Sequence, residues 1–283
     1  MRSVAVSGRP LPSARMISAN IHNDVSAPHT RYSLMVMQFA QFLDHDITFT
    51  PINRGFGESI IDCTSCDSAR TIHPECAPIT VPPNDPWFPN IDRATGRPKC
   101  IAFTRSLPGQ LTLGHRQQLN QDTAFLDGSN TYGSDVCESR KLRTFVGGRL
   151  NSTRHPIRGK DLLPLTHEEV LECKSPSNIC FTGGDTRASE QPGLTSIHTI
   201  FMREHNRIVT ELAQINPHWN DEQLFQNGRR ILSAEFQHVT YNEFLPRVLG
   251  WNAIQLYDLK VLTEGYYGGK KSCYRSYFIG NYY

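Results

Sequence analysis

The stretch Gln41-Phe42-Leu43-Asp44-His45-Asp46 lies near the end of a segment, from Tyr32 to Ile47, whose apolar residues recur at the spacing of a helix. These apolar residues are Leu34, Val36, Met37, Phe39, Phe42, Leu43 and Ile47. The pattern predicts a buried helix that ends around Thr50-Pro51, because a proline disfavours the α region for the residue before it. Ionisable side chains at the end of a buried helix need partners, since burial disfavours charge.

The Asp-His-Asp triplet in this stretch allows more than one interpretation. A lone histidine in a helix is most often a hydrogen-bonded core residue, but two flanking aspartates favour a functional site. An acidic-His-acidic run would also suit zinc or a hydrolase, since histidine and carboxylates are common metal ligands. Consecutive helix positions point in different directions, so we expect Asp44, His45 and Asp46 to contact three different targets rather than one metal ion.

Two later segments carry oxygen-bearing or charged side chains. In Thr123-Ala124-Phe125-Leu126-Asp127-Gly128-Ser129, side-chain oxygens alternate along the chain and Gly128 permits a tight turn. This pattern suits calcium, which takes about six to eight oxygen ligands, and it also suits a turn bonded to its own backbone. The segment Gly183-Gly184-Asp185-Thr186-Arg187-Ala188-Ser189-Glu190 precedes the strongest helix; by itself it would provide a helix cap and a surface arginine.

The remaining pattern predicts a mainly α protein. Apolar stripes predict helices over about 193–216 and 220–241, the second capped by Asn220-Asp221. The first stripe contains Leu194, Ile197, Ile200, Phe201, Ile208, Val209, Leu212 and Ile215, and the second contains Leu224, Phe225, Ile231, Leu232, Phe236 and Val239. Residues 1–30 are expected to form an extended arm, 52–110 and 138–185 long loops, and almost no sheet is expected because strand-like alternation is sparse.

The composition is that of an ordinary globular protein of 283 residues, 38% hydrophobic and 20% charged. A formal net charge of +2 gives no reason to expect nucleic acid or an anionic membrane as a partner, and no apolar run approaches the roughly 18 to 20 residues that a membrane span needs. The first residues lack the apolar centre of a secretory signal. The sequon at Asn151 and the bunched cysteines nevertheless favour an oxidising, secretory route and a start further upstream.

In this order and spacing, the three motifs resemble those of the animal haem peroxidases. The resemblance runs from about residue 8 to 268 and includes Pro82-Pro83-Asn84-Asp85-Pro86, Tyr132-Gly133-Ser134 and Arg203-Glu204-His205-Asn206-Arg207. It implies a mainly α, truncated haem-peroxidase fold, in which long helices are joined by loops stabilised by disulfides and calcium. Residues 1–268 would then be the distal part of a peroxidase domain, and 269–283 a tail that matches no part of the family.

The resemblance also implies a role for each motif residue. His45 would be the distal histidine, Gln41 its neighbour above the haem, and Arg187 the distal arginine. Carboxylates matching Asp44 and Glu190 form ester links to haem b in the family, whereas Gln191 stands where one mammalian enzyme has a third link. Calcium would be held by Asp46, Thr123, the carbonyl of Phe125, Asp127 and Ser129.

The family's disulfides would pair Cys63 with Cys76, Cys66 with Cys100, and Cys173 with Cys180, although sequence alone allows other pairings. Cys137 and Cys273 have no partner in this pairing, and an intermolecular disulfide through either one is an alternative that the sequence allows. His205 is expected to join Glu204 and Arg207 in a buried hydrogen-bonded network, because charged groups beside an apolar stripe need partners.

Two functions follow as expectations. The first is a haem peroxidase that oxidises halide or phenolic and organic donors with hydrogen peroxide. The family's proximal histidine, however, lies downstream of the last match, and the tail after Gly269 holds no histidine. This polypeptide by itself is therefore expected to be inactive. The alternative function is a catalytically inactive, secreted peroxidase-like module with extracellular-matrix partners.

Overall fold

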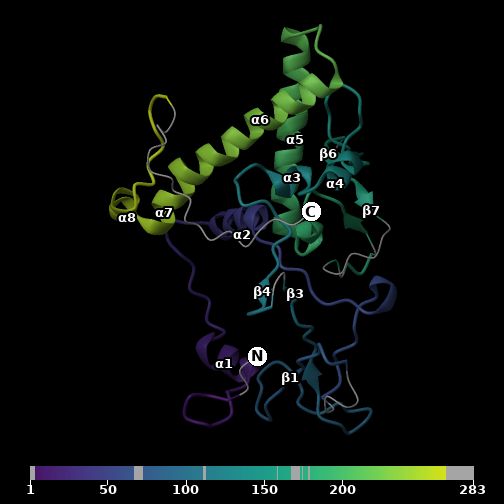
Figure 1. The fold of residues 1–283 in the computed structure, drawn as a ribbon, viewed down its shortest axis with the longest axis vertical. Coiled ribbons are helices and arrows are strands. Elements are labelled where there is room, and N and C mark those ends of the chain that lie inside the picture. The colour runs from purple at the N-terminus through teal and green to yellow at the C-terminus, as the bar shows by residue number, and fades with distance from the viewer. Residues whose placement is uncertain are drawn as a thin grey trace. The chain divides into compact units, whose positions relative to one another are not determined.

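The computed structural model describes residues 4–66, 73–110, 113–157, 159–166, 173, 175–177 and 179–265 (Figure 1). The predicted tail 269–283 and Cys273 lie outside the described residues. The chain divides into two compact units. The first combines residues 1–29 with 50–119, and the second combines residues 30–49 with 120–283.

The first unit consists mainly of loops joined by short ladders and two disulfides. Its elements are α1 (Ala14–Ile21), the 3-10 turn η1 (Phe56–Glu58), and the antiparallel pairs β1 (Ile79–Thr80) with β2 (Cys100–Ile101) and β3 (Pro108–Gly109) with β4 (Gln117–Gln118). The disulfides join Cys63 to Cys76 and Cys66 to Cys100. Both pairings predicted from the resemblance are confirmed, and they constrain a stretch that has little helix.

The prediction of an extended arm over residues 1–30 was wrong at α1. The helix buries none of its own residues, so its stability depends on a contact elsewhere in the same unit. Arg15 donates from NH2 to Asp85 Oδ1 at 2.9 Å, and its guanidinium lies 5.1 Å from the centre of the Phe88 ring. A helix of eight residues has only about two turns, so its pattern is too short to identify it from sequence.

The second unit contains the long helices. Its helical elements are α2 (Met35–Ile47), α3 (Ser129–Tyr132), α4 (Val136–Lys141), the 3-10 turn η2 (Thr186–Ser189), α5 (Pro192–Ile215), α6 (Asp221–His238), the π-helical η3 (Val239–Phe244), α7 (Leu245–Leu249) and α8 (Trp251–Leu256). Its ladders pair β5 (Thr153–Arg154) with β6 (Asp161–Leu162) and β7 (Leu165–Thr166) with β8 (Cys180–Phe181). The third predicted disulfide, Cys173 to Cys180, is also confirmed. A mainly α fold with little strand is therefore correct.

Helices α5 and α6 cross and pack against each other in this unit (Figure 1). Helix α6 begins at the predicted cap, where Asn220 and Gln223 form a reciprocal capping box. Gly228 lies at the crossing, because a Cβ atom there would be 2.4 Å from Cγ1 of Val209. A small residue at this position lets the two helices approach each other.

The predicted stripe of α5 is only partly buried. Ile200 is 53% exposed and Ile215 is 75% exposed, whereas four polar side chains of the helix are buried: His198, Thr199, His205 and Asn206. Hydrogen bonds make this burial possible, since Asn206 donates to the carbonyl of Leu150 and accepts from its amide. Buried polar side chains therefore occupy positions that a hydrophobic pattern assigns to the surface.

Helix α2 also differs from the fully buried helix that its sequence predicts. The buried residues are Gln38, Phe42, His45 and Asp46, and only Phe42 is apolar. Phe42 stacks on Phe201 at 4.6 Å and meets Phe236 edge-on at 5.5 Å between ring centres. Leu34 and Met37 remain 68% and 48% exposed, because α3, α5, α6 and η3 of the described residues pack against the other side of the helix.

Candidate functional site

The Asp-His-Asp triplet directs three consecutive side chains to different surroundings. His45 and Asp46 are buried and Asp44 is exposed. The members of the triplet have different contacts: Asp46 faces residues 128–130, and His45 faces Asp185. They do not converge on one metal, and among the described residues no group of three or more His, Cys, Asp or Glu side chains does so either.

His45 is a buried imidazole with one unsatisfied nitrogen. Its Nδ1 lies 3.8 Å from Oδ1 of Asp185, which is close enough for electrostatic attraction but too long for a hydrogen bond. Nδ1 accordingly has no hydrogen-bond partner. Burial lowers the pKa of His45, and the neighbouring positive charge of Arg187 lowers this pKa further. The arrangement favours the neutral imidazole, which can accept a proton.

Arg187 belongs to η2 and is held from several sides. Its Nε and NH2 atoms donate to Asp185, the latter at 2.5 Å, and NH2 also lies 3.3 Å from Oδ2 of Asp122. NH1 donates to the carbonyl of Thr48 at 2.8 Å, and the guanidinium lies over the ring of Phe49 at 4.6 Å. The side chain is only 16% exposed, so the interpretation of Arg187 as a free surface charge is excluded.

Gln41 and Glu190 connect α2 to the segment that carries Arg187. Nε2 of Gln41 donates to Oε2 of Glu190 at 2.5 Å, and Nε2 of Gln191 donates to Oε1 of Gln41 at 3.0 Å. Asp44 lies three residues after Gln41, on the same side of the helix. Both Asp44 and Glu190 are exposed. The two carboxylates that the resemblance assigns to cofactor attachment are thus available for a ligand.

The carboxylate of Asp46 is enclosed by the loop that precedes α3. It accepts hydrogen bonds from the backbone amides of Gly128 and Asn130 at 3.3 and 3.1 Å, and from the hydroxyl of Ser129 at 3.1 Å. Burial raises its pKa to about 6 in spite of these bonds, and the negative charge of Asp127 raises it as well.

The other oxygen atoms of this loop are linked to the same cluster. The hydroxyl of Thr123 donates to Oδ1 of Asp127 at 2.8 Å and to the carbonyl of Phe125 at 3.2 Å, and the amide of Ser129 donates to the same Asp127 oxygen at 3.2 Å. Two carboxylates, two hydroxyls and a carbonyl therefore gather on adjacent segments. This is an oxygen-only set of the kind that a hard cation such as calcium takes, so the residues fit that ion.

Asp122, Asp185 and Asn130 lie among these residues but were not assigned to the site from sequence. The sequence offered either Asp185 or Ser189 as a helix cap, and Asp185 caps η2 by accepting from the amide of Arg187 at 2.6 Å. Asp122 is buried between Ser134 and Arg187, and burial raises its pKa to about 6. Asn130 donates to the carbonyl of Phe42 at 2.7 Å. For Asp122, the available signal was its position directly before the Thr123 loop.

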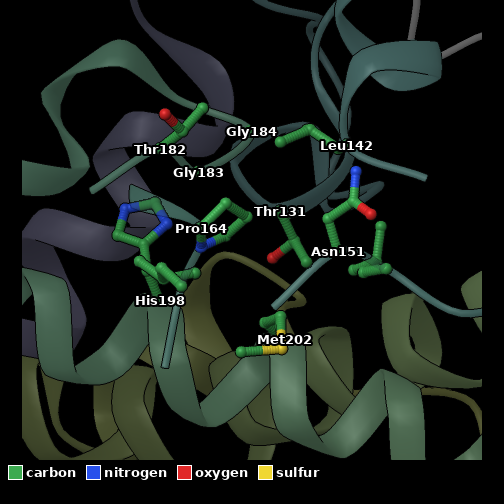
Figure 2. Close-up of a pocket in the computed structure, with 11 residues that line it drawn as sticks. Thr131, Leu142, Asn151, Pro164, Thr182, Gly183, Gly184, His198 and Met202 are labelled. Atoms are coloured by element: carbon green, nitrogen blue, oxygen red, sulfur yellow. The ribbon is translucent and has the colours of Figure 1, made fainter. Parts of the chain in front are cut away.

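Two further histidines, His198 and His205, are buried within the fold. His205 lies between the hydroxyl of Tyr132 and the carbonyl of Gly148, at 2.8 Å from each. His198 lines a small pocket with Thr131 and Met202 (Figure 2), and its Nε2 has no hydrogen-bond partner. Burial lowers the pKa of each of these two imidazoles to about 4.

The predicted network of His205 with its sequence neighbours was wrong. Arg207 is 51% exposed at its side chain and pairs with Glu204 and Glu211. Residues one and two positions from a buried histidine lie on other faces of the helix. His205 finds its partners instead in α3 and in the loop at Gly148.

The sequon residue Asn151 is engaged within the fold. Its side-chain nitrogen donates to the carbonyls of Lys141 and Arg143 at 3.0 and 3.1 Å. A glycan on this nitrogen would replace one of the hydrogens that these bonds use. The geometry therefore weighs against modification of Asn151 in the folded protein. In the described residues, Cys137 is exposed and forms no disulfide, and none of their helices combines the length and apolarity of a membrane span.

Comparison with known proteins gives relatives along most of the chain. The family model described as Animal haem peroxidase matches residues 1–278. Heme peroxidase 2 of Caenorhabditis elegans is 37% identical over 277 residues, which cover 95% of this chain and 36% of that protein. Human myeloperoxidase is 39% identical over 264 residues, covering 88% of this chain and 34% of that protein.

The fold comparison agrees with the sequence comparison. Peroxidase A from Dictyostelium discoideum superposes with a TM-score of 0.66 at 24% sequence identity, over 84% of this chain and 46% of that chain. This likeness shows that the mainly helical fold is shared. The chain spans about a third of the length of the curated relatives it matches.

Proposed function

Because this chain belongs to the animal haem peroxidase family, we propose that it supplies the peroxide-activating side of a haem site. The reaction would oxidise halide or phenolic donors with hydrogen peroxide. The observation that carries this proposal is the meeting of His45 and Arg187 at one buried carboxylate, that of Asp185. A neutral base and a permanent cation in one place are what cleavage of a peroxide bond requires.

The residues around this pair fit a haem. Gln41 and Asp44 lie in the second half of α2 and Glu190 directly follows η2, and the two carboxylates are exposed. When bound, haem would supply the redox chemistry that no protein side chain offers. Asp44 and Glu190 are proposed to attach it through ester links, and Gln41 to lie beside the reacting oxygen atoms.

The chain's own residues would then move one proton and stabilise one developing charge. Nε2 of His45 takes a proton from hydrogen peroxide and returns it to the departing oxygen, which leaves as water. Arg187 cannot lose its proton, so it stabilises the negative charge that develops as the O–O bond breaks. Each role needs a group of fixed position, and the contacts of Arg187 with Asp185, Asp122 and Thr48 support that requirement.

Calcium is proposed to bind at Asp46, Thr123, Phe125, Asp127 and Ser129. The positive charge of the ion would balance the negative charges of the two carboxylates. The ion would also join α2 to the loop before α3. Chelation should then lower the thermal midpoint of the protein, and added calcium should restore it. Magnesium is the matched control, because it is smaller and demands a stricter octahedral geometry.

A bound haem would also need a histidine ligand from the protein. His198 and His205 are buried against other groups, so neither is proposed as the proximal ligand. We propose that residues 1–283 by themselves do not turn over, and that they then form an inactive peroxidase-like module. Three disulfides support an oxidising, extracellular location for either form. We also propose that this module binds extracellular-matrix partners or forms an intermolecular disulfide through Cys137.

Haem titration of the polypeptide tests the peroxidase function. We expect a Soret band on haem binding. Although the polypeptide is not expected to turn over, its haem-loaded form should react once with peroxide, and this single reaction should slow by about 10²–10⁴-fold in His45→Gln, the range for loss of an acid–base catalyst. His218→Gln is the matched control, because His218 is exposed in the loop between α5 and α6. Equal rates in the two variants would refute the role of His45. Failure to bind haem would favour the inactive module.

A further inference from the structure

We infer that Asp185 is a positioning residue that orients both the guanidinium of Arg187 and the imidazole of His45. The catalytic purpose of this orientation rests on the proposed peroxidase function. The orientation itself does not depend on that function, because it consists of contacts within the polypeptide. The inference is that one buried carboxylate fixes the direction of the base and of the cation together.

The contact of Asp185 with Arg187 involves both the side chain and the backbone. Nε of Arg187 donates to Oδ1 and Oδ2 at 2.9 and 3.1 Å, and NH2 donates to Oδ2 at 2.5 Å. The backbone amide of Arg187 also donates to Oδ1, at 2.6 Å. A planar guanidinium that shares two nitrogens with one carboxylate has a fixed plane. The cap and the ion pair therefore act on Arg187 together.

The contact with His45 is the part that a helix cap does not explain. Oδ1 of Asp185 lies 3.8 Å from Nδ1 of His45, and that nitrogen is buried with no hydrogen-bond partner. Hydrogen bonds of a reacting group are often long without its ligand and shorten when the ligand is bound. An unpaired buried nitrogen that faces a carboxylate is stabilised when it carries the proton.

The chemical consequence concerns the tautomer of His45. A proton on Nδ1 that is directed at Asp185 leaves Nε2 with a free lone pair. This is the tautomer that a base needs in order to accept a proton at Nε2. A carboxylate behind a histidine selects a tautomer in the same way in other enzymes.

The position of Asp185 is itself strongly constrained. Its side chain is only 3% exposed. A Cβ atom on the preceding Gly184 would lie 2.4 Å from the carbonyl carbon of Thr131 and 2.6 Å from the amide of Tyr132. The backbone before Asp185 is thus packed directly against the backbone of α3. Asp122 also reaches Arg187, at 3.3 Å, but His45 is within ion-pair distance of Asp185 only, among the pairs of the described residues.

Nuclear magnetic resonance of the haem-free polypeptide tests the inference. With ¹⁵N-labelled histidine, long-range ¹H–¹⁵N correlations report which ring nitrogen carries the proton, and His45→Gln identifies the signal. We expect the Nδ1–H tautomer for His45 at neutral pH. With ¹⁵N-labelled arginine, we expect the Nε–H of Arg187 to exchange with solvent at least about tenfold more slowly than that of exposed Arg93.

Variants then assign both effects to Asp185. Asp185→Ala should abolish the tautomer preference of His45 and the protection of the Arg187 Nε–H. Asp135→Ala is the matched control, because Asp135 also caps a helix, accepting from the amides of Cys137 and Glu138. Among the described residues, it forms no hydrogen bond or ion pair with His45 or Arg187. Both signals should be unchanged in that variant. A loss of stability in both variants with unchanged His45 and Arg187 signals would reduce Asp185 to a cap and overturn the inference.

The measurement on the wild-type protein tests the inference even if Asp185→Ala does not fold. An Nε2–H tautomer of His45 in the wild type would overturn the inference directly. Asp185→Asn keeps a cap acceptor and supplies a second variant, in which the protection of the Arg187 Nε–H should fall. Because no haem or peroxide is present, the result does not depend on whether the chain is a peroxidase.

Discussion

The crossing of α5 and α6 allows a sharp prediction at Gly228. Replacing this glycine by alanine would normally favour a helix, because glycine inside a helix costs about 1 kcal/mol relative to alanine. At this position, the new Cβ atom would lie 2.4 Å from Cγ1 of Val209 and 3.2 Å from Cε1 of His205. Both neighbours would have to move. The gain in helix propensity and the cost of this steric clash therefore have opposite effects on stability.

The clash should exceed the gain in helix propensity. Valine is stiff at χ1 in a helix, Val209 is fully buried, and His205 is held by hydrogen bonds at both nitrogens. Overpacking of a core costs about 1–3 kcal/mol. We therefore expect Gly228→Ala to lower the free energy of unfolding by up to about 2 kcal/mol, after the gain of about 1 kcal/mol is subtracted.

Urea unfolding followed by circular dichroism measures this change. Arg230→Ala, at an exposed position of the same helix, is the control and should change stability by less than about 0.5 kcal/mol. In Val209→Ala with Gly228→Ala, the new methyl group occupies space that the valine leaves. The double variant should thus lose less than the sum of the two single losses. A stabilised Gly228→Ala, or strict additivity in the double variant, would refute the reasoning.

Three further outcomes are expected. Tyr132→Phe should lower stability by about 1–3 kcal/mol, because it leaves a nitrogen of His205 buried without a partner; Tyr257→Phe, at a side chain that is 68% exposed, is the control and should have no effect in the same urea titration. Stability should fall between pH 7 and pH 5, since the pKa values of His198 and His205 in the fold, both about 4, lie below the unfolded value and the unfolded chain therefore binds more protons. The loss should be about 2 kcal/mol per histidine at pH 5. Protonation of Asp46 and Asp122, whose pKa values in the fold are raised to about 6, offsets part of this loss. The urea midpoint should therefore fall by less than the two histidines alone predict, and a constant midpoint would contradict the expected fall. Mass spectrometry of protein secreted from eukaryotic cells should find Asn151 unmodified, and a glycosidase-sensitive mass at that residue would show that its hydrogen bonds do not protect it.

The long helices could be predicted because their sequence signals are local. Helical spacing located α5 and α6, and the capping pair at Asn220 needs only residues three positions apart. The different directions of Asp44, His45 and Asp46 follow from helix geometry alone. The disulfide pairings were of another kind, since spacing left them open and only the family resemblance selected them.

The burial of polar side chains was not predictable, because it depends on partners far away in sequence. His205 is buried by Tyr132 and Gly148, which are more than fifty residues away. The apolar face of α2 was expected to be buried, yet Leu34 and Met37 remain exposed in the described residues. A hydrophobic pattern reports which side chains avoid water, but not which surface covers them. Asp122 and Asp185 were not assigned to the candidate site for the same reason, since their contacts with Arg187 and His45 join segments that are far apart in the sequence.

Asp44, His45 and Asp46 lie within one turn of α2 and have three different surroundings. This arrangement makes the site sensitive to changes in the length of the chain. A residue inserted or deleted earlier in the helix would rotate everything after it by about 100° and shift it by about 1.5 Å. The imidazole, the exposed carboxylate and the buried carboxylate would lose their surroundings in one event. Single substitutions can adjust any of these side chains separately, whereas the number of residues between Gln38 and Asp46 is effectively fixed.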